Sequence, residues 1–300
     1  MRLHQRFVSP FLASREIQGQ FSVSDRSSWY QLKGDLLSPL LQSTFMQSFF
    51  DSETQKFIND SIATSGSLCL QLYYALMSFI LSFFLSKTSI NGILNRGAMF
   101  LFSTKQLRYF LNIPTEWSPI HKRVLDLGAG DGSVTKKLAA FYANVHTTEI
   151  SQVRKKKNLI FKSVNRHYNP RKLLRDIYVA ALRSNCSVLV AIVLPIDQYV
   201  EFHPSKRTNR AETHSVTCLD VRLKVKGSTI EQQASSLVEN EFIPLGFQVV
   251  RWTKLPYLCE GDLNRPFYVL EDVVFLLHPM PTETLRLSSS NGFTYVSNEL

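Results

Sequence analysis

The stretch RVLDLGAGDG at residues 123–132 constrains the fold of this 300-residue chain more than any other feature. Arg123 to Leu127 is a short β-type run that breaks directly into glycines. Ser133 to Tyr142 follows with helical periodicity. A strand, a glycine-rich turn and a helix in this order form the nucleotide-binding opening of a doubly wound α/β sheet. The sequence therefore predicts a Rossmann-like α/β fold with a ligand at this turn.

A second predicted strand, Asn144 to Thr148, is followed by an acid in a suitable place. Glu149 lies 17 residues after Gly132. A carboxylate at the end of the second strand suits the two hydroxyls of a ribose. Gly128 and Gly130 allow the backbone to pass close to a ligand. Together these features predict a site for a nucleoside.

The acids beside the glycines indicate which nucleotide. Asp126 and Asp131 would repel a pyrophosphate, but they can face a cationic amino-acid amine. The string therefore resembles motif I of class I S-adenosylmethionine-dependent methyltransferases, and it argues against a nicotinamide-dependent oxidoreductase. A tight turn with no ligand is the structural alternative. The predicted cofactor-binding residues are Asp126, Leu127, Gly128, Ala129, Gly130, Asp131 and Glu149.

Three further strings narrow the comparison to one family. They are LSKTSINGILNRGAMFLFS at 85–103, SVLVAIVLPIDQY at 187–199 and RWTKLPYLCEGDLNRPFYVLEDVVFLLH at 251–278. With RVLDLGAGDG and TEIS, they resemble the DREV family over about residues 50 to 279. The resemblance implies methyl transfer from S-adenosyl-L-methionine to the N-pros nitrogen of histidine in alternating-His (HxH) protein segments. It also implies the endoplasmic reticulum or the mitochondrion as the compartment, and the segments Arg96 to Phe102 and Tyr257 to Tyr268 as walls of a peptide site.

Histidine methylation sets its own chemical requirements. The imidazole must be neutral to attack, and a carboxylate that accepts N–H from one ring nitrogen presents the lone pair of the other. We rank Glu260 and Asp262 highest as catalytic candidates, because Pro256 and Gly261 suggest a loop around them. The other acids of this segment are Glu271 and Asp272. A solvated turn is the alternative for both candidates.

Two tyrosines complete the predicted catalytic set. Tyr257 and Tyr268 could line the site by stacking on imidazole. Ordinary packing is the alternative for Tyr268, which lies in the strand-like run FYVLEDVVFLL. Methyl transfer needs no thiol, so we interpret Cys259 as a packed side chain. No CxxC or CxH spacing occurs among the four cysteines, and we predict no metal site.

The middle of the chain is too short for the expected sheet. Between Glu149 and Ser187 there are 37 residues, and Leu173 to Leu182 has helix composition. Ser151 to Pro170 would then have to supply a helix and two strands in 20 residues, which does not fit. Compared with the family, most of the third strand and the fourth strand are missing, with the Asn and Asp that face the substrate. We therefore expect a sheet that lacks one or two strands.

Three explanations of the short middle stay open. The chain is an exon-skipped or mis-assembled product, a diverged member in which Asn158 to Val164 replaces the fourth strand, or an inactive relative. A non-catalytic binding protein that keeps only the cofactor turn is the rival function. Unpaired central strands leave buried backbone groups that each cost on the order of 1–3 kcal/mol. We predict a lower thermal unfolding midpoint than that of a full-length relative.

An uncharged run precedes the motif. No residue from Ser61 to Ser86 is charged. The polar residues Ser67, Gln71, Ser78 and Ser82 recur near helical spacing, opposite Leu72, Leu76, Phe79 and Phe83. We predict a buried amphipathic helix packed on the domain; a membrane span and an interfacial helix are the alternatives.

The domain boundaries follow from these segments. We expect a variable, partly disordered segment at 1–50, the amphipathic helical segment at 51–89, the methyltransferase domain at 90–278 and a tail at 279–300. The net charge is +10, and most of the excess lies in one basic stretch, Arg154 to Lys172. We interpret this stretch as a solvated segment of a monomer. Membrane association and an RNA substrate are not favoured, although salt-dependent RNA binding would support the latter.

Overall fold

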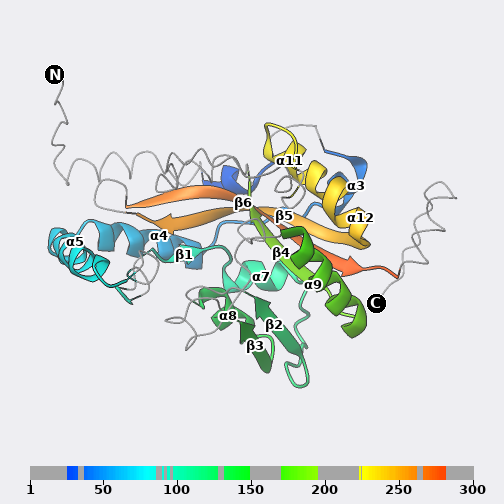
Figure 1. Cartoon of the computed structure of the whole chain (residues 1–300), viewed down its shortest axis with the longest axis horizontal. Coiled ribbons are helices and arrows are strands. Elements are labelled where there is room, and N and C mark those ends of the chain that lie inside the picture. The colour runs from blue at the N-terminus through cyan, green and yellow to red at the C-terminus, as the bar shows by residue number, and fades with distance from the viewer. Residues whose placement is uncertain are drawn as a thin grey trace. The chain divides into compact units, whose positions relative to one another are not determined.

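Helices and strands alternate irregularly along the chain, and the strands of the described residues form two separate sheets (Figure 1). The structure, a computed structural model, describes residues 26–32, 37–85, 90, 93–94, 97–127, 132–148, 170–194, 223, 225–261 and 266–281. Its helices are η1 (Ser27–Tyr30), α3 (Pro39–Thr44), α4 (Ser52–Ser65), α5 (Leu68–Ser82), α7 (Thr104–Phe110), α8 (Ser133–Leu138), α9 (Pro170–Ser184), α11 (Ile230–Leu237), the π-helical η5 (Val238–Phe242) and α12 (Ile243–Leu245). Its strands are β1 (Met99–Phe100), β2 (Arg123–Leu127), β3 (Asn144–Thr148), β4 (Val188–Val193), β5 (Phe247–Glu260) and β6 (Phe267–Pro279).

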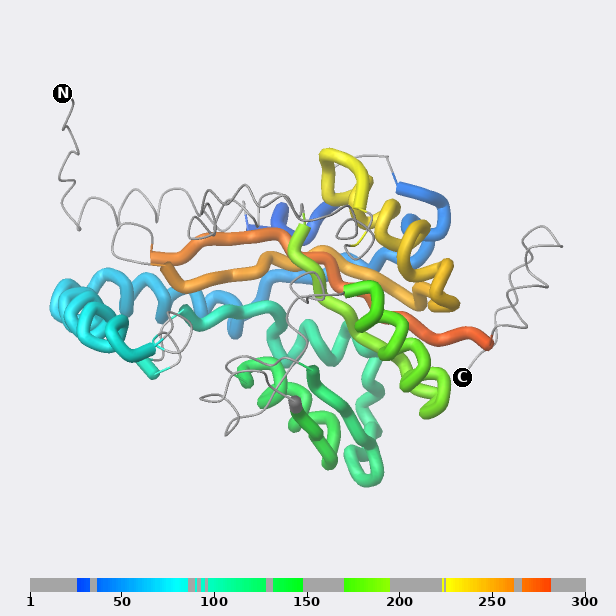
Figure 2. The backbone as a smooth tube through the Cα atoms, viewed as in Figure 1, coloured from blue at the N-terminus to red at the C-terminus, as the bar shows by residue number. Residues whose placement is uncertain are grey.

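The larger sheet has four strands in the order β1-β5-β6-β4. β5 and β6 are neighbours joined by a short connection, residues 261–266, so they form a hairpin, and Figure 2 shows them running side by side. β1 pairs antiparallel with the end of β5. The mixed α/β architecture is consistent with the predicted Rossmann-like fold. A sheet with antiparallel strands differs, however, from the parallel sheet of a doubly wound fold.

The chain divides into two units, which share this hairpin. The first unit contains residues 1–32, 47–162 and 253–272, and the second contains 33–46, 163–252 and 273–300. The helices α4 and α5 therefore belong to the same unit as the glycine-rich motif. The core of the first unit includes Ile58, Phe100, Leu258 and Phe267, all buried.

The second unit is built around the indole of Trp252. This side chain is fully buried, and its Nε1–H donates to the carbonyl of Leu41 at 2.6 Å. Its ring stacks on that of Phe275, with 6.0 Å between the centroids, and Phe242 meets Phe275 edge-on at 5.2 Å. Large aromatic side chains contribute much apolar area to a core, so this cluster holds α3, β5, β6 and η5 together.

The smaller sheet consists of β2 and β3, which pair in parallel. Both strands have the bounds that the sequence predicts. The predicted helix at 133–142 is confirmed at its start, but α8 ends at Leu138. The strand expected within 187–199 is β4, which covers Val188–Val193. Within the described residues, β2 and β3 pair only with each other.

One expectation is wrong. α5 forms within the uncharged run as predicted, but none of its residues is buried. Leu72, Leu76 and Phe79 are each more than half exposed. The apolar positions of a helix pattern show that a helix has an apolar face, but not which surroundings that face meets.

Candidate functional site

The end of β2, after which the glycine-rich string begins in the sequence, lies beside the end of β3. The register of the parallel pair runs from Arg123 opposite Asn144 to Leu127 opposite Thr148. Both strands therefore end at the same edge, and the next residues of the chain are Gly128 and Glu149. The predicted nucleoside-binding turn and the predicted ribose carboxylate therefore follow directly in the sequence after two adjacent strand ends. Gly128, Ala129, Gly130, Asp131 and Glu149 themselves lie outside the described residues.

Asp126 connects the strand before the turn to the helix after it. Its carboxyl group is buried at 2% exposure, and its Oδ2 accepts a hydrogen bond from Thr135 Oγ1 at 2.5 Å. In the structure, one oxygen of this carboxylate is bonded to Thr135, which connects the end of β2 to α8. That this carboxylate can also face a cationic ligand amine stays a prediction.

The turn ends at Gly132, whose backbone conformation favours glycine. Gly132 precedes α8 with φ 78° and ψ 9°, in the left-handed region that side chains disfavour. Lys136 N–H donates to the Gly132 carbonyl at 2.9 Å, which is the first bond of the helix. A glycine at this position thus allows the chain to turn sharply from the motif into α8.

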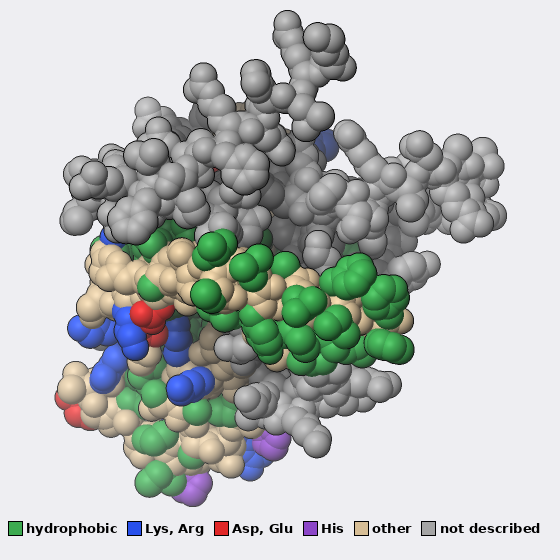
Figure 3. Space-filling model, turned by 90° about the vertical axis from the view of Figure 1, so that its left-hand side faces the viewer, with side chains coloured by type: hydrophobic (Ala, Val, Ile, Leu, Met, Phe, Trp, Pro, Cys, Tyr) green, Lys and Arg blue, Asp and Glu red, His purple; other side chains and the backbone are tan. Residues whose placement is uncertain are grey.

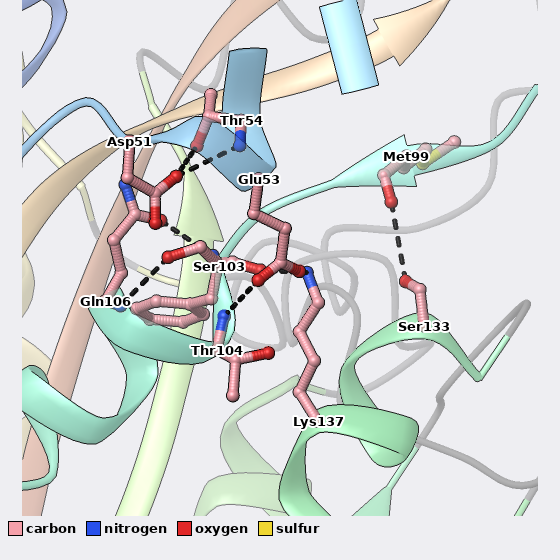
Figure 4. A network of polar contacts seen from close by, with 10 residues as sticks. Asp51, Glu53, Thr54, Met99, Ser103, Thr104, Gln106, Ser133 and Lys137 are labelled. Atoms are coloured by element: carbon pink, nitrogen blue, oxygen red, sulfur yellow. Dashed lines mark hydrogen bonds and ion pairs between the residues drawn. The ribbon is translucent and has the colours of Figure 1, made fainter. Parts of the chain in front are cut away.

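Lys137 links α8 to the N-terminal helices (Figure 4). Its Nζ lies 3.0 Å from Glu53 Oε1 on α4, and it donates to the carbonyl of Phe102. The same Nζ lies 4.0 Å from the centroid of the Phe100 ring, and the side chain is only 12% exposed. We call Glu53, Phe100, Phe102, Thr104 and Lys137 the Lys137 cluster. It holds α8 against α4 and the segment that follows β1.

The Glu53 carboxylate has a second partner in this cluster. Its Oε2 accepts the backbone N–H of Thr104 at 2.7 Å. Burial raises the pKa of Glu53, but the Thr104 N–H and the Lys137 ammonium outweigh it and hold the pKa below its ordinary value. The carboxylate is therefore charged at neutral pH, and it joins the starts of α4 and α7 to α8.

Helix caps fix the starts of α4 and α7 in the same region (Figure 4). Asp51 accepts from Thr54 N at 3.0 Å and from Thr54 Oγ1 at 2.8 Å. Ser103 and Gln106 form a capping box, with bonds of 2.9 and 2.7 Å. Gln106 also donates to the hydroxyl of buried Tyr30 at 3.1 Å, and burial raises the pKa of Tyr30 to about 12. These helix starts are thus rigidly placed beside α8.

The strand β1 connects α8 to the predicted substrate wall. Ser133 Oγ, in the first turn of α8, donates to the carbonyl of Met99 at 3.5 Å (Figure 4). Met99 is paired with Cys259 on β5, and the Tyr257 hydroxyl donates to Met99 Sδ at 2.6 Å. Tyr257 is 6% exposed. It is therefore a packed wall residue close to the helix that follows the glycine turn.

Glu260 lies at the end of this wall. Its Oε2 accepts from the N–H of Ala98 at 3.3 Å, and its own N–H donates to the Ala98 carbonyl at 3.0 Å. The predicted loop around it is wrong, because Glu260 is the last residue of β5 and Pro256 lies within that strand. Proline is compatible with a strand where its missing N–H is not required by the ladder.

The structure describes only one of the two remaining predicted catalytic residues. Tyr268 lies on β6 and is partly buried, and Asp262 lies outside the described residues. Cys259 is buried, as expected for a packed thiol. The first unit thus contains Asp126, Leu127, Tyr257, Glu260 and Tyr268.

Sequence reasoning missed the residues that hold these pieces together. Glu53, Met99, Thr135 and Lys137 were not singled out. The chain gives one local signal, since Asp51 and Glu53 begin a helix where acids are favourable. Glu53 and Lys137 are 84 positions apart, however, and no periodicity predicts a contact over that distance.

The basic stretch is only partly described. Arg171 donates to both carboxylate oxygens of Glu241 at 2.8–3.1 Å, and Lys172 pairs with Asp176 at 2.6 Å. Glu241 is buried at 3%. Arg171 thus links α9 to the buried Glu241 of η5, whereas Lys172 forms an exposed ion pair within α9.

A family model independently matches most of the chain. The model of the DREV methyltransferase family matches residues 29–162 and 157–279. The two matched segments meet at 157–162, inside the stretch that is too short for the expected sheet. The match also includes α4 and α5, which are N-terminal to the glycine-rich motif, and the Lys137 cluster, in which Lys137 follows that motif.

Proposed function

Because the chain belongs to the DREV methyltransferase family, we propose that it transfers a methyl group from S-adenosyl-L-methionine to a histidine in a protein. The target is the N-pros nitrogen in an alternating-His (HxH) segment. The register of β2 and β3 carries this proposal, because the two strands end side by side and the glycine string and Glu149 follow them directly in the sequence. A nucleoside needs both at one edge.

The residues fit this cofactor. The left-handed Gly132 and the Asp126–Thr135 bond define where the turn begins and ends. Gly128 and Gly130 would allow close approach, Glu149 would hold the ribose, and Asp131 would face the amine. When bound, the cofactor supplies a methyl group on a sulfonium that is already activated for transfer. The chain's own task is then mainly to position the nucleophile.

We assign the positioning of the substrate histidine to residues at the end of β5 and in the segment that follows it. A carboxylate of Glu260 or Asp262 would accept the N–H of one imidazole nitrogen, which leaves the other nitrogen with its lone pair. The Ala98 N–H that the Glu260 carboxylate accepts, and the backbone bond between the same two residues, would keep that carboxylate in a fixed orientation. Tyr257 and Tyr268 would contribute aromatic walls.

The test is methylation of a synthetic HxH peptide by the full chain, with mass spectrometry to locate the methyl group. We expect transfer to histidine and none to the same peptide with alanine at both histidines. Glu260→Gln keeps an oxygen for the Ala98 N–H but loses the charge, so we expect a lower rate of transfer. Glu239→Gln, an exposed acid of the other unit, is the control. Transfer to another residue type would contradict the proposal.

A non-catalytic role has its own supporting observation. The described β2–β3 pair and the four-stranded sheet are separate, and the family match divides within the short stretch between β3 and β4. This arrangement suits a chain that lacks the strand between them and the Asn and Asp expected on it. Saturable cofactor binding without methylation of the HxH peptide would favour this alternative.

A further inference from the structure

The helix α5 presents an apolar surface that the rest of the described chain does not cover. None of its residues is buried, and the exposed side chains are large. Leu72, Leu76, Phe79 and Phe83 are 62%, 59%, 65% and 69% exposed. Figure 3 shows hydrophobic side chains gathered in a broad area on one face of the molecule. Monomeric proteins rarely expose such an area without a partner.

The exposed face is broad. At about 100° per residue, the exposed apolar side chains from Leu68 to Ile80 cover an arc of about 140°. Gln71, Ser78 and Ser82 lie on the opposite side. A seam for a second helix is narrower, because it uses one a/d stripe. A broad arc is suited to a fluid apolar medium instead.

The dimensions decide between spanning a membrane and lying on it. No single described helix is long and apolar enough to cross a membrane, and only α4 and α5 together, bent by 76°, match by length and composition. α4 contains Glu53, Lys56 and Asp60, and its Ile58 is fully buried in the core of the first unit. α4 therefore cannot enter lipid without opening that core. The 15 residues of α5 measure about 22 Å, less than a bilayer's apolar thickness.

On α4, α7 and α8 of the same unit, exposed cations outnumber exposed acids, of which Asp60 is one. No charge occurs from Ser61 to Ser86, whereas Lys56, Lys105 and Lys136 are exposed on α4, α7 and α8 of the same unit. Figure 3 shows Lys and Arg side chains beside the apolar area, with few acids among them. An apolar helix flanked by exposed cations is complementary to a bilayer with anionic headgroups.

We propose that α5 docks into the headgroup region of an anionic lipid bilayer and lies in its plane. The apolar arc enters the lipid, the polar stripe stays at the surface, and the neighbouring lysines contact the headgroups. This site is independent of the methyl-transfer site, so it does not depend on whether the chain is catalytically active.

The test is co-sedimentation of the full chain with vesicles. We expect binding to vesicles of phosphatidylcholine with phosphatidylserine, and weaker binding to phosphatidylcholine alone. The double change Phe79→Ser and Phe83→Ser should lower the partition coefficient by more than about tenfold, because two phenyl groups leave the lipid. Ile120→Ser removes an equally exposed side chain (64%) outside α5 and should leave binding unchanged.

The same variants distinguish a lipid bilayer from a second copy of the chain as the partner of the α5 surface. The exposed positions make the double variant foldable, which an unchanged thermal unfolding midpoint checks. Lys136→Gln should weaken binding only to the anionic vesicles. Absence of vesicle binding by the folded chain would overturn the proposal. So would a dimer in light scattering that the double variant abolishes, because a second copy would then cover α5.

Discussion

The two sheets of this chain differ in how their side chains are buried. On β6, Val273, Val274, Phe275 and Leu277 are fully buried. On β2, only Asp126 is buried, and Leu125 is 58% exposed. Within the described residues, the strand that begins the ligand motif therefore has less apolar support than β6.

The difference indicates that stability and function lie in different places. A two-stranded sheet is marginal by itself, whereas a longer sheet with a buried face is stable. The β2–β3 pair depends on α8, which the Asp126–Thr135 bond and the Lys137 cluster hold in place. The hairpin of β5 and β6 depends on its own core. Mutations in the two regions should therefore act on different properties.

The largest effect on stability is expected in the larger sheet. Trp252→Ala removes a fully buried indole and leaves the Leu41 carbonyl without its donor. We expect a loss of about 3–5 kcal/mol of unfolding free energy. Urea unfolding followed by circular dichroism measures it. A loss below about 1 kcal/mol would mean that the hairpin core is not the main source of stability.

The next effect concerns the support of α8. Lys137→Met keeps an apolar chain over Phe100 but removes the ion pair with Glu53 and the bond to Phe102. Since Glu53 is partly exposed, we expect a loss of only about 1–2 kcal/mol of unfolding free energy. We also expect a weaker affinity for S-adenosylhomocysteine, the product that the cofactor becomes after methyl transfer. Lys136→Met, its exposed neighbour, is the control. Equal effects of the two variants would show that the Lys137 cluster does not support the turn.

A smaller effect should depend on pH. The pKa of Glu53 is lower in the folded chain than its ordinary value of 4.5, so its contribution is full above that value. The contribution is lost as the pH falls through the folded pKa. We expect the wild type to exceed Glu53→Gln in unfolding free energy by about 0.5–1 kcal/mol at neutral pH, with the gap closing in acid. A gap that widens in acid would contradict this sign.

The smallest effect is expected on β2. Leu125→Ala shortens an exposed side chain, so we expect a change below about 0.5 kcal/mol in the same urea experiment. A loss that approaches that of Trp252→Ala would reveal a packing partner for β2. It would also remove the contrast between the two sheets.

Local patterns predicted the parts that depend on neighbouring residues. The bounds of β2 and β3 followed from an apolar run that ends in glycine or an acid, and the glycine turn implied parallel strands with a shared edge. The same local logic failed at Glu260. Pro256 and Gly261 suggested a loop, but the long pairing of β5 continues through the proline.

Contacts between distant segments were not predictable. The pairing of Glu53 with Lys137 depends on how α4 packs against α8, and no spacing in the sequence encodes that packing. The exposure of α5 was missed for a different reason. A helix with an apolar arc and a polar stripe has the same pattern whether the arc meets a core or lipid.

The central claim is that the β2–β3 pair is a working cofactor site in spite of its separation from the larger sheet. Calorimetric titration of S-adenosylhomocysteine into the purified chain tests it directly, with Glu149→Ala as the matched variant. We predict saturable binding to the wild type and an affinity at least about tenfold lower for the variant, since the ribose loses a charge-assisted acceptor. A chain that is folded by circular dichroism but shows no saturable binding would contradict the account.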